Sequence, residues 1–211
     1  MAATRLCIVR HGETAWNAEG RVQGQLDIPL SEVGQAQALA LAAALAGERF
    51  EAIYSSDLAR VRQTAQPLAT RLNLAVVADP RLRERHYGVF QNMTYAECKN
   101  RLPADYARFK AKDLDYDFGT GESLRAFNER SIACIAQLAS RHPGGQILVF
   151  THGGVLEMVH RHASQYGLSS PRGFEIPNAA VNRVEVSSTA WKITAWADVA
   201  HLSAALDDLP D

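Results

Sequence analysis

Two histidine-glycine dipeptides in this sequence each follow a short apolar run. Residues 5–9 lead into Arg10 and His11, and residues 146–150 lead through a threonine into His152. A neutral, well-oriented imidazole is a competent covalent nucleophile, and a neighbouring guanidinium group binds oxyanions. One such dipeptide after a strand is usually structural, whereas two of them beside an arginine indicate chemistry on an anion. We therefore expect His11 to be a nucleophile and Arg10 to bind an anion beside it.

A third segment brings a further arginine. Residues 52–55 are expected to form a short strand, and Arg60 follows in the first turns of a helix. In open α/β sheets, ligands bind beyond the carboxyl ends of the strands, where helix N-termini also attract anions. If these strands are parallel, one sheet edge carries enough positive charge to bind a dianion such as a phosphoryl group. The side chains expected at this edge are those of Arg10, His11, Arg60 and His152.

Alternating strand and helix patterns determine the expected architecture. The expected strands are residues 5–9, 52–55, 74–77 and 146–150, followed by a hairpin of 181–187 and 190–196. The expected helices are residues 32–47, a segment starting near 58, and residues 93–101, 104–111, 122–141 and 154–166, with a loop over 12–30. Strands that alternate with helices indicate a sheet covered on both faces. We expect an α/β protein with three α/β/α layers, a mostly parallel central sheet and a small helical insertion near the active site.

Local signals indicate where the helices begin and end. Ser31 is the expected N-cap of the helix over 32–47, because its side chain can accept a hydrogen bond from an unpaired backbone N–H group. Ser56 or Asp57 is expected to cap the next helix. Pro67 lies inside this second helical pattern, where a proline costs about 3 kcal/mol, so we expect a kink or a break there.

The chain is expected to form one domain over residues 1–211, with a core of about 1–84 and 121–211. Between these parts, residues 85–120 mix aromatic and charged side chains and contain a proline and a Gly-Thr-Gly run. We expect this insertion to cap the active site. The alternative is a surface elaboration that only packs against the core.

Composition and charge limit the expected partners and location. The net charge of −1 argues against general binding to nucleic acid or to an anionic membrane. No run of 18 apolar residues is present, so no membrane span is expected, and the N-terminus lacks the pattern of a signal peptide. The three cysteines are far apart and odd in number, which is typical of thiols in a reducing compartment. A cytoplasmic protein is therefore expected.

Six groups of residues between positions 5 and 154 form one ordered pattern. The groups are Arg10-His11-Gly12-Glu13-Thr14 with Trp16-Asn17; Gln23-Gly24 with Asp27, Pro29-Leu30-Ser31 and Gly34; Ser55-Ser56-Asp57-Leu58 with Arg60, Gln63 and Thr64; Leu82-Arg83-Glu84 with Gly88; Gly121-Glu122-Ser123; and Thr151-His152-Gly153-Gly154. An Arg-His-Gly triplet alone is a weak signal. The ordered set resembles the histidine phosphatase superfamily, which includes the phosphoglycerate mutase-like proteins.

The resemblance implies roles for the matching residues. It implies that His11 attacks phosphorus and becomes a transient phosphohistidine, and that Glu84 gives a proton to the leaving oxygen. A carboxylic acid can do this at neutral pH if burial or a nearby anion raises its pKa. The implied catalytic residues are His11, Glu84, His152, Arg10 and Arg60. The implied substrate- or phosphate-binding residues are Arg10, Asn17, Gln23, Arg60, His152 and Gly153, with Gln23 at the mouth of the pocket.

The expected function is hydrolysis of a small phosphorylated metabolite, as in a histidine acid-type phosphatase. No metal-ligand spacing and no nucleotide-binding glycine loop is present, so neither a metal nor another cofactor is implied. Phosphoglycerate mutase is the first alternative. The chain is shorter than typical cofactor-dependent mutases and lacks their basic, proline-rich insertion between Glu84 and Gly121, which favours the phosphatase. The second alternative is a regulatory phosphate-binding domain without turnover, which would need the cations but not the acid Glu84.

Other expectations concern the surroundings of the site. Arg83 and Arg85 are expected to be surface charges, with contact to the substrate as the alternative for either, and Trp16 is expected to form a wall of the pocket. His86 is a weaker candidate for the leaving-group pocket. The apolar edge at 181–196 is a candidate surface for pairing with a second copy of the chain, which would give a homodimer.

Overall fold

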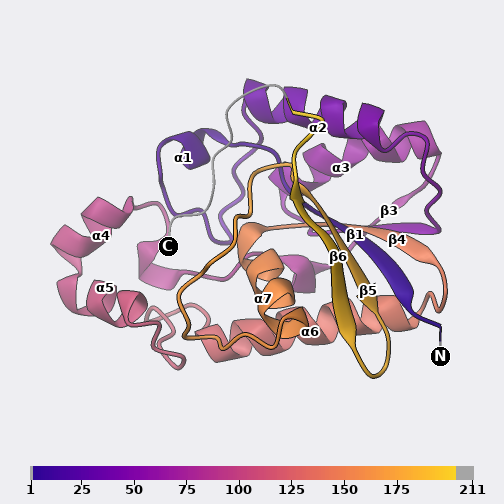
Figure 1. Cartoon of the computed structure of the whole chain (residues 1–211). Coiled ribbons are helices and arrows are strands. Elements are labelled where there is room, and N and C mark those ends of the chain that lie inside the picture. Colours follow the sequence, from indigo (N-terminus) through magenta and orange to yellow (C-terminus); the bar gives the residue numbers. More distant parts are fainter. Residues whose placement is uncertain (1, 203–211) are drawn as a thin grey trace.

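The computed structural model describes residues 2–202, which form a six-stranded sheet between two layers of helices (Figure 1). The strands are β1 (Thr4–Arg10), β2 (Ala52–Ser55), β3 (Val76–Ala78), β4 (Gln146–Thr151), β5 (Val181–Val186) and β6 (Trp191–Asp198). Their order across the sheet is β3-β2-β4-β1-β5-β6, and among these strands only β5 runs opposite to the others. This arrangement confirms the expected three-layer α/β/α fold with a mostly parallel central sheet.

The longer helices cover both faces of the sheet. They are α2 (Glu32–Ala44) and α3 (Ala59–Leu72) on one face, and α6 (Leu124–Ser140) and α7 (Gly153–Ala163) on the other. Leu6 and Ile8 of β1 pack with α6 and α7, while Cys7 and Val9 pack with α2 and α3. Successive side chains of a strand point to opposite faces, so the buried run along β1 serves both helix layers. None of the helices in the described chain is long and apolar enough to cross a membrane.

The parallel register brings the carboxyl ends of three strands together. Arg10 pairs with Thr151 between β1 and β4, and Ser55 pairs with Phe150 between β2 and β4. The N–H of His11 then donates to the carbonyl oxygen of Thr151 (3.0 Å), which extends the ladder one residue past β1. The loops after β1, β2 and β4 therefore start from one edge of the sheet.

The segment over residues 85–120 lies outside the sheet and has its own small core. It carries the turn η2 (Gly88–Phe90) and the helices α4 (Tyr95–Arg101) and α5 (Pro103–Lys110), and the turn η1 (Pro80–Leu82) precedes it. Phe90 and Phe118 are fully buried in its aromatic cluster, with ring centroids 5.1 Å apart in an edge-to-face arrangement. Figure 1 shows α4 and α5 on the side of the molecule toward which β1 runs.

The prediction that the side chain of Ser56 or Asp57 caps α3 is wrong. The N-cap is Leu58, whose side chain makes no capping hydrogen bond. Instead, Asp27 Oδ1 accepts a hydrogen bond from the N–H of Ala59 (2.6 Å). The carboxylate of Asp57 is occupied by the guanidinium group of Arg83. A residue 32 positions earlier in the chain therefore caps this helix, and a short-range pattern cannot reveal such a contact.

The expected break at Pro67 does not occur, because α3 is continuous through this position. A proline removes one intrahelical N–H donor, and that loss destabilises the helix. Val61, Ala65 and Leu68 are buried along one face of α3 and pack against the sheet. Most helical stability in proteins comes from such packing, which offsets the lost hydrogen bond here.

An additional short helix and a later strand start also differ from expectation. A short helix, α1 (Ala15–Ala18), lies within the loop expected over 12–30. It forms because Thr14 Oγ1 accepts from the N–H of Asn17 (3.2 Å) and Asn17 Oδ1 accepts from the N–H of Thr14 (3.1 Å), a reciprocal cap. Strand β3 starts two residues later than expected, because Asn73 ends α3 in the left-handed conformation and the next N–H still donates to a helix carbonyl.

A close contact joins the start of α2 to the loop after β1. The N–H of Gly34 donates to Oγ of the N-cap Ser31 (3.1 Å), which confirms Ser31 as the cap. The N–H of Ser31 donates to the carbonyl oxygen of Glu13 (2.9 Å). A Cβ atom on Gly34 would overlap the backbone of Glu13, so a side chain at this position has no room.

Gly34→Ala is expected to lower the free energy of unfolding by about 1–3 kcal/mol, because the backbone must move to admit the methyl group. Urea unfolding followed by circular dichroism measures the change. Gly47→Ala is the matched control, since nothing lies within 4 Å of a Cβ atom at that position. Equal stability of the two variants would contradict the close contact.

Candidate active site

His11 is buried at the end of β1, with 4% of its surface exposed. Its ring Nδ1 lies 2.7 Å from the carbonyl oxygen of Gly12. A carbonyl oxygen only accepts hydrogen bonds, so this contact places the proton of the neutral ring on Nδ1 and leaves the lone pair on Nε2. Burial, followed by the charges of Arg60 and Arg10, holds the pKa of His11 well below its ordinary value. The ring is therefore neutral at physiological pH, which is the form that a nucleophilic imidazole requires.

Two residues from elsewhere in the chain fix the backbone around His11. The N–H of Gly12 donates to Thr64 Oγ1 (2.9 Å), whose hydroxyl donates to the carbonyl oxygen of Arg60 (2.7 Å). Asn178 Nδ2 donates to the carbonyl oxygen of His11 (2.9 Å). The sequence pattern includes Thr64 but not Asn178, which is separated from His11 by 167 residues and belongs to no motif.

Arg10 and Arg60 are each 1% exposed, and backbone carbonyl groups orient both guanidinium groups. Arg10 Nη1 donates to the carbonyl oxygen of Ile176 (2.6 Å). Arg60 Nη1 and Nη2 donate to the carbonyl oxygens of Leu26 (2.8 Å) and Gly24 (2.7 Å). Burial lowers the pKa of Arg60 to about 10, which still leaves it cationic at neutral pH. Carbonyl groups satisfy these donors without cancelling their charge, so this edge of the sheet attracts an anion.

His152 is fully buried next to His11, edge-on to its ring, with the ring centroids 5.3 Å apart. Both of its ring nitrogens have protein partners. Arg60 Nη2 donates to Nδ1 (3.2 Å), so Nε2 carries the proton and donates to Ser56 Oγ (2.9 Å). The next residue, Gly153, lines the cavity beside His11, whereas the ring of His152 lies behind that wall. In this arrangement His152 positions Arg60, and a direct contact of its ring with phosphate stays a prediction.

Glu84 lines the same cavity as His11 and is 8% exposed. Its Oε1 accepts from the N–H of Arg85 (2.7 Å), and its Oε2 accepts from the N–H of Gly154 (2.9 Å). Burial raises the pKa of Glu84, while the two N–H groups and the nearby arginines act in the opposite direction. A Cβ atom on Gly154 would overlap the carboxylate, so a glycine at the start of α7 makes room for the acid.

An arginine outside the sequence pattern fixes the segment that carries Glu84. Arg130 of α6 donates to the carbonyl oxygens of Arg81 (2.6 Å), Arg83 (3.0 Å) and Glu84 (3.3 Å). Its Nε and Nη2 also bind the carboxylate of Glu122, at 2.7 Å each. A charged residue on an amphipathic helix normally faces solvent, so the pattern of α6 gave no signal of this role.

One cavity of about 240 Å³ brings most of the expected site residues together. Those that line it are Arg10, His11, Asn17, Gln23, Arg60, Glu84 and Gly153. Trp16 also lines it, as expected. Asn17 Oδ1 accepts from both the N–H and the hydroxyl of Thr14, so the NH₂ group of Asn17 remains as a donor. Gln23 Oε1 is buried and has no hydrogen-bond partner within residues 2–202.

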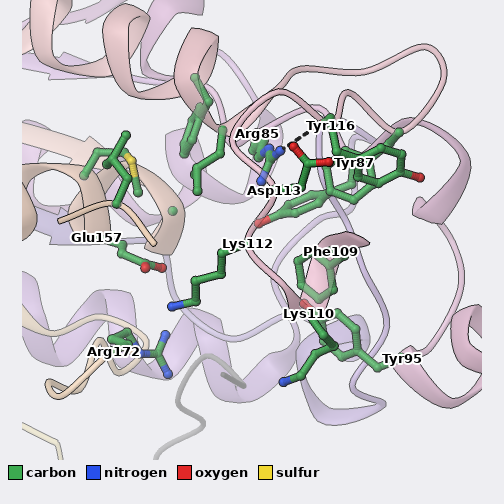
Figure 2. A pocket seen from close by; sticks show the side chains of 16 residues that line it. Arg85, Tyr87, Tyr95, Phe109, Lys110, Lys112, Asp113, Tyr116, Glu157 and Arg172 are labelled. Carbon is green, nitrogen blue, oxygen red and sulfur yellow. Dashed lines mark hydrogen bonds between the residues drawn. The ribbon is translucent and has the colours of Figure 1, made fainter. Parts of the chain in front are cut away.

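A second cavity of about 100 Å³ adjoins the first, and Figure 2 shows the side chains around it. Tyr87 and Tyr95 line both cavities. We call the second cavity the aromatic chamber, because its walls include Tyr87, Tyr95, Phe109, Tyr116, Phe118 and Phe127. Burial raises the pKa of Tyr87, and the charge of Glu84 adds to this effect, so its phenol is neutral. Residues 85–120 thus contribute to the walls of both cavities.

Arg85 is not the surface charge that the sequence suggested, because it lines the aromatic chamber and is 6% exposed. Its Nε donates to the carbonyl oxygen of Glu122 (2.9 Å), and its Nη2 donates to that of Tyr116 (3.0 Å; dashed in Figure 2). Its guanidinium group lies over the ring of Phe118, 4.6 Å from the centroid. His86 lines neither cavity.

The combined arrangement suits phosphoryl transfer. A neutral imidazole, two buried cations and a buried carboxyl group share one cavity, and transfer of a phosphoryl group needs a nucleophile, charge stabilisation and a proton donor. In the described part of the chain, no three His, Cys, Asp or Glu side chains are grouped as a metal site would require.

Known proteins resemble this chain in both sequence and fold. The model of the histidine phosphatase superfamily (branch 1) matches residues 6–199. A metal-independent phosphoserine phosphatase from Arabidopsis thaliana is 41% identical over 203 residues, covering 95% of this chain and 84% of the relative. A probable phosphoglycerate mutase GpmB from Yersinia pestis is 32% identical over 212 residues, covering 96% and 97%. The structure of Bacillus stearothermophilus YhfR matches with a TM-score of 0.85 at 31% identity, over 94% of this chain and 99% of that one. The chain therefore belongs to the histidine phosphatase superfamily.

Proposed function

We propose that this chain hydrolyses phosphomonoesters of small metabolites through a phosphohistidine intermediate on His11. The observation that carries the proposal is the single cavity lined by the neutral His11, the cations Arg10 and Arg60, and the acid Glu84. The relatives support phosphatase activity in general. The buried acid supports turnover, because a domain that only binds phosphate needs the cations alone.

In the first step, the phosphoryl group of the substrate binds next to Arg10 and Arg60, and His11 Nε2 attacks phosphorus. The bond between phosphorus and the ester oxygen breaks, and Glu84 gives that oxygen its proton. Charge develops on the equatorial phosphoryl oxygens during the transfer, where buried cations stabilise it more than they would in water. The NH₂ group of Asn17 lines the same cavity and is a further donor to these oxygens.

In the second step, water takes the place of the departed alcohol and attacks the phosphohistidine. Glu84, now a carboxylate, accepts a proton from this water while the bond between phosphorus and His11 breaks. Inorganic phosphate leaves, and both side chains return to their starting states. The N–H groups of Arg85 and Gly154 hold the carboxyl group in one orientation, which serves proton transfer in both directions.

O-Phosphoserine is the substrate that we propose to test first. One supporting observation is the relative that is named a phosphoserine phosphatase. The other is the aromatic chamber, which offers space for a small leaving group beside the acid. The relative named a probable phosphoglycerate mutase favours the mutase as second candidate, which predicts that 2- and 3-phosphoglycerate interconvert faster than either loses phosphate.

We keep the cytoplasm as the proposed location. Cys7, Cys98 and Cys134 are free and buried. Burial raises the pKa of the Cys7 thiol to about 12, which makes the reactive thiolate scarce. Such thiols behave as small apolar residues in a reducing compartment. A homodimer formed through the edge of β5 and β6 stays a prediction.

His11→Ala is expected to reduce phosphate release from every substrate by at least about 1,000-fold, because the covalent intermediate cannot form. The measurement is phosphate release from O-phosphoserine, 2- and 3-phosphoglycerate and p-nitrophenyl phosphate. His162→Ala replaces an exposed histidine and is the matched control. Release that persists in His11→Ala would overturn the proposed nucleophile, and wild-type interconversion of the phosphoglycerates faster than their hydrolysis would favour the mutase.

The pH dependence of kcat/KM is expected to follow the ionisation of Glu84. Burial raises its pKa, so the proton-donating acid persists to higher pH than in an ordinary glutamate and is lost as the pH rises through that raised value. The lowered pKa of His11 keeps the nucleophile neutral on the acid side. For an alkyl phosphate, kcat/KM should therefore fall on the alkaline side, and Glu84→Gln should remove this fall along with most of the activity. If kcat/KM of Glu84→Gln still falls at alkaline pH, that fall belongs to the ionisation of a group other than Glu84.

Gly154→Ala is expected to lower kcat for an alkyl phosphate by about 10- to 100-fold, because the methyl group displaces the carboxylate of Glu84. An aryl phosphate has a good leaving group that needs less help from a proton donor, so kcat for this ester should fall less. Alanine favours the helix by about 1 kcal/mol over glycine, so unfolding of the variant would not explain such a selective loss. Equal losses on the two esters would argue against displacement of a general acid.

A further inference from the structure

Two carboxylates and four cationic side chains line the aromatic chamber, and the surroundings of the two carboxylates differ. The cations are Arg85, Lys110, Lys112 and Arg172. Both oxygens of Asp113 have partners, because Oδ2 accepts from Arg108 Nε (2.8 Å) and Oδ1 accepts from the N–H of Asp115 (3.0 Å). Glu157 uses only Oε1, which accepts from Arg161 Nε (2.8 Å) and pairs with Arg161 Nη2 (2.7 Å). Within residues 2–202, Oε2 of Glu157 accepts no hydrogen bond. The chamber therefore has one carboxylate oxygen available to a ligand.

Glu157 lies close to the reacting groups. It follows Gly153, which lines the cavity of His11, by four residues of α7, or about 6 Å along the helix axis. It follows Gly154, whose N–H holds Glu84, by three residues, so the two positions share one face of the helix. Figure 2 shows the carboxylate at the chamber wall formed by α7, facing Lys112. Lys112 Nζ donates to the carbonyl oxygen of Ser170 (2.9 Å) and does not occupy the carboxylate.

The position of this carboxylate is fixed before a ligand arrives. Arg161 is 1% exposed, and it also donates to the carbonyl oxygens of Gly167 (2.6 Å) and Ser170 (2.9 Å). The ion pair with this anchored guanidinium group keeps Oε1 in place and so directs Oε2. A ligand that binds Oε2 does not need to order the side chain, which lowers the entropic cost of binding.

We propose that Glu157 Oε2 binds an ammonium group on the leaving group of the substrate, and that this contact selects amino-bearing phosphomonoesters over their hydroxyl analogues. An ammonium group has three donors and the charge opposite to that of a carboxylate. This proposal rests on the proposed phosphatase function and assigns one determinant of its substrate class.

O-Phosphoserine and 3-phosphoglycerate form the test pair, because they differ by an ammonium group in place of a hydroxyl group. In Glu157→Gln, the ratio of kcat/KM for O-phosphoserine to that for 3-phosphoglycerate is expected to fall by about 10-fold or more, as for loss of a hydrogen bond between charged groups. O-Phosphoethanolamine has an ammonium group but no carboxylate, and its kcat/KM should fall by the same factor in Glu157→Gln. Glutamine still offers an oxygen to Arg161, and a thermal melt checks that the variant is folded.

Asp113→Asn is the matched control, because it removes the same charge from the same chamber at a carboxylate without an available oxygen. The ratio should stay within about 2-fold of the wild-type value in this variant. An unchanged ratio in Glu157→Gln would overturn the ammonium site. An equal fall of the ratio in both variants would also overturn it, because the cause would then be the general loss of negative charge from the chamber.

The proposed function can fail separately from this inference. If the wild type releases phosphate from none of the substrates, hydrolysis is refuted, and equilibrium binding of O-phosphoserine to the wild type and to Glu157→Gln then decides the inference. If p-nitrophenyl phosphate alone is hydrolysed, the inhibition constant of O-phosphoserine in the same two proteins decides it. Equal binding or equal inhibition would overturn the ammonium site, and weaker values in Glu157→Gln would support it.

Discussion

Burial of two guanidinium groups at one edge of the sheet is the constraint on which the site depends. Removing an ion from water costs several kcal/mol, and only hydrogen bonds of good geometry can offset that cost. The carbonyl oxygens that meet Arg10 and Arg60 come from two loops far apart in the chain, one with Ile176 and the other with Gly24 and Leu26. Carbonyl oxygens carry no formal charge, so these contacts leave the positive charge of both guanidinium groups in place, which suits an anion. The loops that cross the sheet edge are therefore part of the binding site itself.

The same positive charge acts on Glu84 against the effect of burial. Burial raises the pKa of this carboxyl group, and Arg60 and Arg10 lower it. Burial is already the largest influence, and a phosphoryl dianion beside the two arginines offsets their charge, so the raising effect of burial is opposed less. Substrate binding would then favour the protonated acid that the first step requires. In the proposed mechanism, departure of the alcohol would leave Glu84 as the base for the second step, held by the same N–H groups of Arg85 and Gly154.

The parts of this structure that depend on local pattern could be predicted from the sequence. The apolar runs before His11 and His152 gave the strands, and parallel pairing placed their ends together. The parts that were missed depend on contacts between distant segments. Asp27 caps a helix from 32 positions away, and Arg85 is buried because its guanidinium group meets a carbonyl oxygen 31 positions later. Asn178 has no neighbouring motif at all, so only the folded chain shows that it holds the backbone of His11.

The two cavities share walls, and this limits how the protein can diverge in evolution. Tyr87 and Tyr95 border both spaces, so a change at either residue alters the geometry around phosphorus together with the space for the leaving group. Phe127, Met158 and Leu168 border only the aromatic chamber. Descendants of this chain can vary Met158 and Leu168 to admit new leaving groups, whereas Phe127 also packs against Arg130, which fixes the segment of Glu84. A new preference obtained through the tyrosines would instead require compensating changes in the phosphate site.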